Sequence, residues 1–534
     1  MSLLRFGTAR ILRPSPSVMT AIRGDAREHL FSSFSPGRYS GGPAVNAIIQ
    51  HQFTFYDSRL REIVSLLASR DAAEFLLFQY DETYKVFRGF GLGDPSIRQE
   101  WIEIEGLYRR ALKYIVELMC IKRPTGAVLI EKSRAANAME TAIGLAEEAM
   151  HLGELSHRVF SLFPEAWTIW ITNHYGEHDF DLRISGPHEM FDTSFFARVE
   201  VDRADRGSFT GKPQFDIDST THVKFLDPAF QRSFGMRYTD FIAVIHNTIE
   251  HSRPAPDSFP TLFINRETLL DALVKSSNQP REAIDLALLG FTVQPEHLEA
   301  ENRVAFRPKQ SSRAYRRGFF AFPDETGPHL AFSRHMAQEC LSFFVNHVCY
   351  RSLPLEWKTT ETDNALVDLS EAAGKWFEKT IERNLLTLGI VGRRAKRRIG
   401  TGSLRVDIPP DVGELDFLGH CVIDDAIVLI EAKMVLTGLE GSYWRDDVSQ
   451  FVTGKKSFAV QFRKKISWVS NNLDAIVNAL DAPHVRKLQV AMLTLYPCIA
   501  TEMIDDFACR SLTEFMLDYR KHNRWPYAAA LGGI

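Results

Sequence analysis

The sequence predicts an α/β protein whose C-terminal part alternates between helices and strands. Three observations support this. Residues 369–389 carry apolar side chains at helical spacing, residues 413–434 have the pattern of a β-hairpin, and residues 488–496 form an apolar strand after a long amphipathic segment. Two strands connected through a helix form a parallel pair with a right-handed crossover. The order is therefore helix, hairpin, buried strand, helix, strand.

The hairpin has two differently patterned arms. Residues 414–418 alternate between polar and apolar, Asp424 and Asp425 supply turn residues, and residues 426–430 form a continuous apolar run. Such a run is typical of a strand that is buried on both faces. The sequence therefore predicts a turn near positions 424–425.

Candidate catalytic residues lie at the far end of this hairpin. Glu431 and Lys433 are two residues apart at the end of the buried run, so their side chains point to the same face. A turn at 424–425 places Asp416 opposite them. Two carboxylates and an amine then converge, and carboxylate oxygens are hard ligands suited to Mg²⁺, with Mn²⁺ as an alternative.

Composition sets broad limits on the protein. The chain has 534 residues, enough for about two to four domains, and its hydrophobic (45%) and charged (24%) fractions are those of a globular protein. A net charge of −4 leaves room for a local basic groove. Six cysteines without a CxxC pair argue against a structural zinc site and fit a reducing cytosol. No apolar run reaches the ~20 residues of a membrane span, so we expect a cytoplasmic protein.

The pattern along the chain divides it into four parts. Residues 1–43 are basic and are expected to form a poorly ordered tail, with a transit peptide as the alternative. Residues 44–162 are helical in pattern, and 163–358 are mixed, with strands expected at 167–171 and 195–201. A polar linker at 354–363 precedes the last domain, 365–534. The N-terminal parts are expected to regulate or target the last domain.

Residues 365–500 resemble the PD-(D/E)xK nuclease superfamily, whose restriction-endonuclease-like fold has an αβββαβ core. The motifs are WFE ending at Glu378, GELD ending at Asp416, IEAK containing Glu431 and Lys433, and a glutamine, Gln450, one helix later. Pro410-Asp411 also precedes the Glu-x-Lys, so Asp411 is a rival for Asp416. Gly454 stands where some branches have a tyrosine.

The resemblance implies a role for each matched residue. Asp416, Glu431, Glu378 and the carbonyl of Ala432 would hold the metal, and Lys433 would orient or deprotonate the attacking water. Gln450 would support the lysine or contact nucleic acid. We expect phosphate contacts from a basic run before the hairpin, which comprises Arg393, Arg394, Lys396, Arg397 and Arg398. Residues 463–465, also basic, are expected to be a solvated helix face.

The resemblance also implies an activity. It is a Mg²⁺-dependent endonuclease that hydrolyses phosphodiester bonds in double-stranded DNA and leaves a 5′ phosphate. By analogy with Shedu-like or Mrr-like proteins, it would act as a homo-oligomer in prokaryotic defence. The alternatives are an inactive nuclease-fold binding or scaffold protein and a structure-specific recombination or transposition nuclease. Residues 174–179 and the pair His246 and His251 lack metal-site spacing, and the sequence contains no nucleotide-binding motif.

Overall fold

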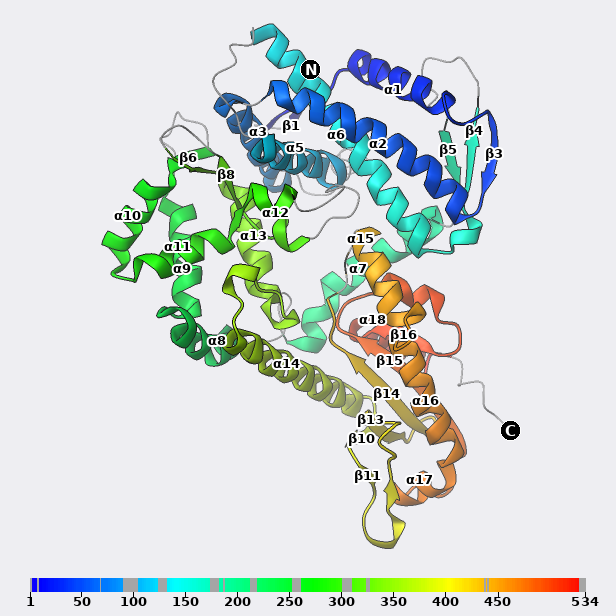
Figure 1. Ribbon diagram of the computed structural model, residues 1–534. Helices are drawn as coiled ribbons and strands as arrows, with labels where there is room; N and C mark the ends of the chain where they lie inside the picture. The colour runs from blue at the N-terminus through cyan, green and yellow to red at the C-terminus, as the bar shows by residue number, and fades with distance from the viewer. Residues whose placement is uncertain are drawn as a thin grey trace. The chain divides into compact units, whose positions relative to one another are not determined.

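The chain folds into two compact units, and the second is built from two separate stretches of sequence. The computed structural model describes residues 2–6, 9–67, 69–89, 104–122, 132–172, 182–185, 188–211, 219–251, 261–299, 310–322, 327–436, 438 and 441–527 (Figure 1). The first unit comprises Met1–Gly186 and Val223–Leu366, and the second comprises Pro187–His222 and Val367–Ile534. The boundary at 366–367 follows the polar linker expected at 354–363, whereas Pro187–His222 falls within the part expected at 163–358.

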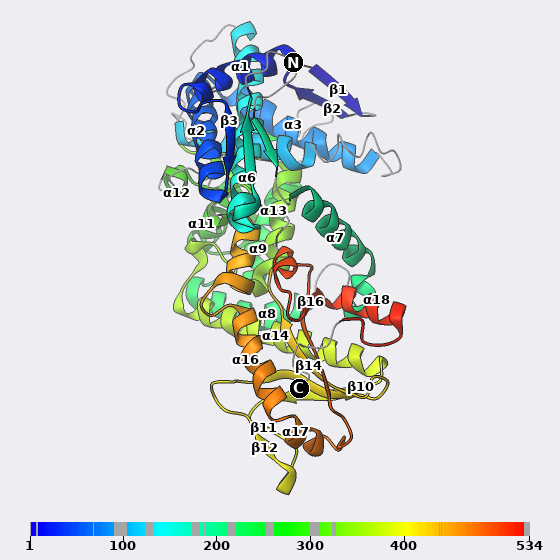
Figure 2. The same cartoon turned by 90° about the vertical axis from the view of Figure 1, so that its right-hand side faces the viewer.

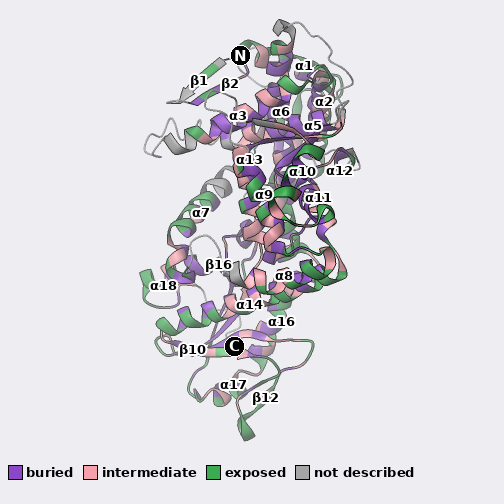
Figure 3. Ribbon diagram, turned by 90° about the vertical axis from the view of Figure 1, so that its left-hand side faces the viewer, coloured by how far each residue is buried: buried purple, intermediate pink, exposed green. Residues whose placement is uncertain are grey.

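The first unit is mainly helical. Helices α2 and α6 lie side by side in its core, and α6 is largely buried (Figures 2 and 3). Its helices are α1 (Pro16–Phe31), α2 (Gly42–Leu66), α3 (Arg70–Gly89), α5 (Arg109–Lys122), α6 (Lys132–Ser161), α9 (Tyr238–His251), α10 (Arg266–Ser277), α11 (Arg281–Gly290), α12 (Pro295–Glu299) and α13 (Arg334–His347). Two more helices, α8 (Ser219–Phe234) and α14 (Thr360–Thr387), cross the unit boundaries.

Three small sheets accompany these helices. Their strand orders are β1-β2, β3-β4-β5 and β6-β9-β8-β7. The strand expected at 167–171 is confirmed as β4. The strands are β1 (Ser2–Phe6), β2 (Ala9–Arg13), β3 (Gly37–Ser40), β4 (Thr168–Ile171), β5 (Leu182–Ser185), β6 (Thr261–Asn265), β7 (Thr292–Val293), β8 (Phe319–Phe322) and β9 (His329–Ser333).

The expectation of a poorly ordered tail at 1–43 is wrong for most of that segment. Helix α1 buries Ile22, Ala26 and Leu30, which are four residues apart and therefore lie on one face. Ahead of the helix, Arg13 forms an ion pair of 3.0 Å with Glu147 of α6. The basic composition suggested a tail because the acidic partners of Arg13 and Arg23, Glu147 and Glu148, lie more than a hundred residues away.

The second unit contains a five-stranded mixed sheet in the order β10-β13-β14-β15-β16. β10, β13 and β14 are successively antiparallel, and β14, β15 and β16 are parallel. The strands are β10 (Ile390–Ala395), β13 (Leu415–Cys421), β14 (Ala426–Lys433), β15 (Lys487–Thr494) and β16 (Ala508–Ser511), with a separate ribbon of β11 (Arg398–Ile399) and β12 (Val406–Asp407). The hairpin and the parallel crossover predicted from the sequence are both confirmed.

Helices of this unit pack against the sheet or beside it. They are α7 (His188–Thr210), the later turns of α14, α15 (Gly441–Val448), α16 (Phe458–Asn471), α17 (Leu473–Ala479) and α18 (Leu512–His522). Helix α14 is followed by Gly389 at φ 73°, a left-handed conformation that favours glycine at a helix end. The long amphipathic helix expected after the hairpin is interrupted after a π-helical turn, Ser449–Thr453.

The two faces of the sheet differ in character. Alternate residues of β13 and β14, including Phe417, Val428 and Ile430, pack with Phe377 of α14 and Phe515 of α18 in one hydrophobic core. The residues between them in sequence point to the opposite face. That opposite face carries the polar end of the hairpin.

Residues 195–201 form part of helix α7 and not the strand expected from the sequence. Phe195, Val199, Asp202 and Arg206 are buried at spacings of three and four residues, and the carboxylate of Asp202 accepts a 2.8 Å hydrogen bond from Nε of Arg206. This helical periodicity outweighs the weak alternation of polar and apolar residues.

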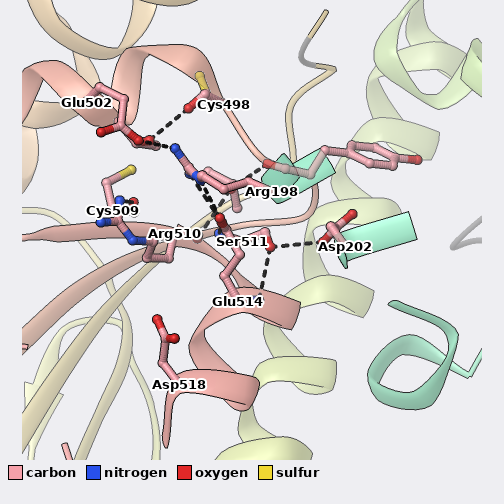
Figure 4. Close-up of polar contacts among 12 residues, drawn as sticks. Arg198, Asp202, Cys498, Glu502, Cys509, Arg510, Ser511, Glu514 and Asp518 are labelled. Carbon is pink, nitrogen blue, oxygen red and sulfur yellow. Dashed lines mark hydrogen bonds and ion pairs between the residues drawn. The ribbon is translucent and has the colours of Figure 1, made fainter. Parts of the chain in front are cut away.

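Charged contacts join α7 to the C-terminal segment of the same unit (Figure 4). The guanidinium of Arg198 forms ion pairs with Glu502 and Glu514. The hydroxyl of Ser511 donates a 2.9 Å hydrogen bond to Asp202. These buried and partly buried contacts explain why Pro187–His222 belongs to the second unit.

None of the described helices combines the length and the apolar character needed to cross a membrane. All six cysteines are buried and free.

Candidate active site

The hairpin brings Asp416 to Glu431 and Lys433. The register pairs Phe417 with Ile430, so the next position along the ladder sets Asp416 against Glu431. Oδ2 of Asp416 accepts a 2.9 Å hydrogen bond from the backbone N–H of Ala432 and lies 3.9 Å from Nζ of Lys433. The three side chains predicted to form the site therefore lie together.

Glu431 is the most buried member of this group, with 2% of its side chain exposed. Lys433 donates to one carboxylate oxygen at 2.6 Å, and Lys465 of α16 donates to the other at 2.6 Å. An isolated buried carboxylate is costly, and two ammonium groups offset that cost. Helix α16 is thus tied to the sheet through this charge.

The expectation that 463–465 is a solvated helix face is therefore wrong for Lys465. Only 10% of its side chain is exposed, while its neighbours Arg463 and Lys464 are exposed. Lys465 occupies a position in the apolar stripe of α16, three residues after Phe462 and four before Val469, both of which are buried. The position of this lysine within the apolar stripe is the feature of the sequence that could have indicated its burial.

A pocket of about 360 Å³ opens beside these residues. One wall is the loop from Pro410 to Glu414, and the floor includes the Asp416, Glu431 and Lys433 side chains. Helix α16 forms another part of the lining. The α16 residues that line the pocket are Gln461, Lys464 and Lys465. Carboxylates and ammonium groups line the same pocket, and this combination suits an anionic ligand held by a cation.

Burial and charge shift the pKa values of the central groups. Burial, followed by the nearby carboxylate of Glu431, raises the pKa of Asp416. Burial alone would lower the pKa of Lys433, but the charges of Glu431 and Asp416 outweigh it and raise the pKa. Lys433 is therefore an ammonium ion at neutral pH in this arrangement, which suits a hydrogen-bond donor.

Glu378 approaches the same region from helix α14. Burial, followed by the charge of Asp416, raises its pKa. Its carboxylate is held at 2.8 Å by Nη1 of Arg394, whose Nη2 binds Glu414. The charge of Asp416 therefore acts on Glu378, whereas the ion pair of Glu378 is with Arg394.

Arg394 differs in its contacts from the other members of the predicted phosphate-binding run. Its guanidinium is half-buried and forms ion pairs with Glu378 and Glu414. The other four members of the run are exposed along β10, the following turn and β11. They are Arg393, Lys396, Arg397 and Arg398.

Gln450 lies outside the lining of the pocket. It is exposed on the π-helical turn. Gln461 lines the pocket instead, four residues before Lys465 and therefore on the same side of α16. Because the helix is interrupted before α16, the glutamine that lines the pocket is Gln461 of α16 and not Gln450 of the π-helical turn.

Asp411 also lines the pocket, from the loop that precedes β13. Asp416 is the residue that contacts Ala432 and Lys433. The geometry therefore favours Asp416 for the central position and places Asp411 at the rim.

The two histidine groups set aside in the sequence have different outcomes. Residues 174–179 lie outside the described residues. His246 and His251 are exposed on α9, and Nδ1 of His251 is 2.9 Å from the carbonyl oxygen of Asn247.

Comparison with known proteins adds no family to this geometry. The chain matches no protein-family model, no curated protein and no solved structure.

Proposed function

We propose that the second unit is a metal-dependent nuclease of the PD-(D/E)xK type. The observation that carries the proposal is the convergence of Asp416, Glu431 and Lys433 at one pocket. The element order supports it, because α14, β10, β13, β14, α16 and β15 follow the αβββαβ order of that superfamily's core.

The acidic residues fit a hard divalent cation. Oxygens of Asp416 and Glu431 both lie around Nζ of Lys433, at 3.9 and 2.6 Å, so the two carboxylates already surround one cationic group. Asp416, Glu431 and the carbonyl of Ala432 would hold Mg²⁺ or Mn²⁺, with pocket water completing the shell. When bound, the ion neutralises the scissile phosphate and makes a water more acidic.

The protein's own groups would position the substrate around that ion. The ammonium of Lys433 would donate a hydrogen bond to the attacking water and hold it in line with the scissile bond. Lys464 and Gln461 would contact the flanking phosphates from α16. We propose double-stranded DNA as the substrate, with Arg393, Lys396, Arg397 and Arg398 binding its backbone.

A direct assay tests the proposal. Full-length protein is incubated with plasmid, linear and single-stranded DNA and with RNA, in Mg²⁺ or EDTA, and products are resolved on gels. We expect Mg²⁺-dependent cleavage of DNA that is lost in Glu431→Ala and Lys433→Ala. The control is Lys375→Ala, which breaks an exposed ion pair with Glu371 on α14. If wild type and all three variants give identical products, the proposed activity is wrong.

A second candidate function is a nucleic-acid-binding protein with an inactive nuclease fold. It is favoured by one observation: both carboxylate oxygens of Glu431 are bound by lysines. In that case DNA binds in fluorescence anisotropy, Mg²⁺ and EDTA give the same affinity, and no cleavage occurs.

A further inference from the structure

A second group of potential metal ligands lies at the turn end of the β13–β14 hairpin. It consists of His420 near the end of β13, Asp425 in the turn and His484 in the loop between α17 and β15. The loop is beside the turn because β14 and β15 are parallel, with Ala426 paired to Lys487. His420 follows Asp416 by four residues, about 13 Å along the strand.

The spacing of the ligand atoms fits a four-coordinate ion. Nε2 of His484 lies 3.0 Å from Oδ1 of Asp425, and Nε2 of His420 lies 3.7 Å from the same oxygen. Zinc bonds of about 2.0–2.1 Å place tetrahedral ligand atoms roughly 3.4 Å apart. The two separations bracket that value, and all three ligand atoms lie within 4.8 Å of one another.

His420 supplies an independent indication. Its Nε2 is buried and, among the described residues, has no hydrogen-bond partner. A buried polar atom without a partner is rare in folded proteins, and coordination to a metal ion satisfies such an atom. The imidazole planes of His420 and His484 are inclined at 83° with centroids 6.1 Å apart, so the rings are not stacked face to face.

The neighbouring charged groups are directed elsewhere. Oδ2 of Asp424 accepts a 2.8 Å hydrogen bond from the backbone N–H of Trp525. Nη1 of Arg486 donates to the carbonyls of Pro483 and Val485, each at 2.8 Å, which holds it against its own loop. The carboxylate of Asp425 is therefore shared mainly by the two imidazoles.

We propose that His420, Asp425 and His484 bind Zn²⁺ or a similar transition-metal ion, with the fourth position open to water. Two imidazoles and one carboxylate suit Zn²⁺ and not Mg²⁺, which prefers an octahedral shell of oxygens. The ion would connect the hairpin turn to the loop that leads into β15. This site shares no residue with the proposed nuclease site and does not depend on its activity.

The test titrates metal-free full-length protein with Co²⁺, followed by visible absorption, and then displaces Co²⁺ with Zn²⁺. Millimolar Mg²⁺ is present throughout to occupy carboxylate-only sites. We expect one tightly bound equivalent with the spectrum of four-coordinate Co²⁺. Because second-shell changes already weaken metal sites by 10–100-fold, loss of a direct ligand in His484→Ala should weaken Zn²⁺ binding by about 100-fold or more.

Two further variants make the result decisive. Asp425→Asn should weaken binding as His484→Ala does, and both residues are exposed, so neither change threatens folding. His522→Ala removes an exposed histidine from the end of α18 and should bind Zn²⁺ like the wild type. If His484→Ala and Asp425→Asn keep wild-type affinity, or if Mg²⁺ displaces the ion, the proposed site does not exist.

Discussion

Replacing Lys465 with methionine tests whether α16 is held to the sheet by a buried charge. Nζ of Lys465 and Nζ of Lys433 each lie 2.6 Å from a different oxygen of Glu431. Methionine keeps most of the apolar stem of the lysine and removes the charge. The carboxylate of Glu431, which is 2% exposed, is then left with one cationic partner.

The expected loss of stability follows from this burial. Removing one partner of a buried ion pair costs about 3–5 kcal/mol because the other charge stays buried. Since Lys433 still neutralises Glu431, the lower end of that range, about 3 kcal/mol, is expected for Lys465→Met. Lys464→Met changes an exposed lysine one residue earlier and should stay within about 0.5 kcal/mol of the wild type.

The assay should report on the second unit alone, because a two-unit chain need not unfold in one step. Hydrogen–deuterium exchange of peptides from β14 and α16 gives their local free energy of opening. The double variant Glu431→Gln/Lys465→Met should be more stable than Lys465→Met, since it no longer buries the charge. Unchanged exchange in Lys465→Met, or strictly additive effects in the double variant, would refute this reasoning.

Three other predictions concern pH, packing and DNA binding. Burial raises the pKa of Asp447 from 3.8 to about 7, so the native state keeps a proton that the unfolded chain releases. The free energy of unfolding should therefore fall by roughly 4 kcal/mol as pH rises from 4 to above 7. Urea midpoints measured against pH should lose this dependence in Asp447→Asn. Equal pH dependence in the wild type and the variant would contradict the prediction. Arg198→Ala leaves the carboxylates of Glu502 and Glu514 without their cation. Limited proteolysis should therefore cut α7 at least tenfold faster than in the wild type. An unchanged rate would mean that the ion pairs do not stabilise α7. Fluorescence anisotropy with duplex DNA gives the slope of the log binding constant against the log salt concentration. Lys396→Ala and Arg397→Ala should each reduce the magnitude of this slope by about 0.9, while Lys375→Ala should leave it unchanged. Equal slopes in all variants would mean that this segment does not contact DNA.

Local patterns in the sequence were sufficient to predict the hairpin and its polar end. The alternation in β13, the turn at Asp425 and the apolar run of β14 act over a few residues, so register and face follow directly. This is why Asp416, Glu431 and Lys433 could be predicted to converge. The different contacts of Arg394 within the basic run could not be predicted in the same way, because its acidic partners lie on helix α14 and in the loop before β13.

Residues whose partners lie far away in the sequence could not be assigned to the site or to the second unit from the sequence. The position of Lys465 in the apolar stripe of α16 indicates burial, but it does not identify the partner, because Glu431 lies 34 residues earlier in the chain. The resemblance pointed to Gln450, and Gln461 had no signal of its own because the break before α16 is not visible in the apolar periodicity. The partners of α7 are more than 300 residues away, so its place in the second unit has no local signal.

The discontinuity of the second unit has a consequence for protein synthesis. Arg198 precedes its partner Glu514 by 316 residues, and the intervening chain includes a large part of the first unit. At about 5–20 residues per second, a ribosome needs roughly 15–60 s to make the missing segment. During that time the apolar face of α7 and the charged groups that become buried in the folded unit are exposed to solvent. The first unit can begin to fold in that interval, whereas the pocket around Glu431 can close only after α16 and β15 have emerged.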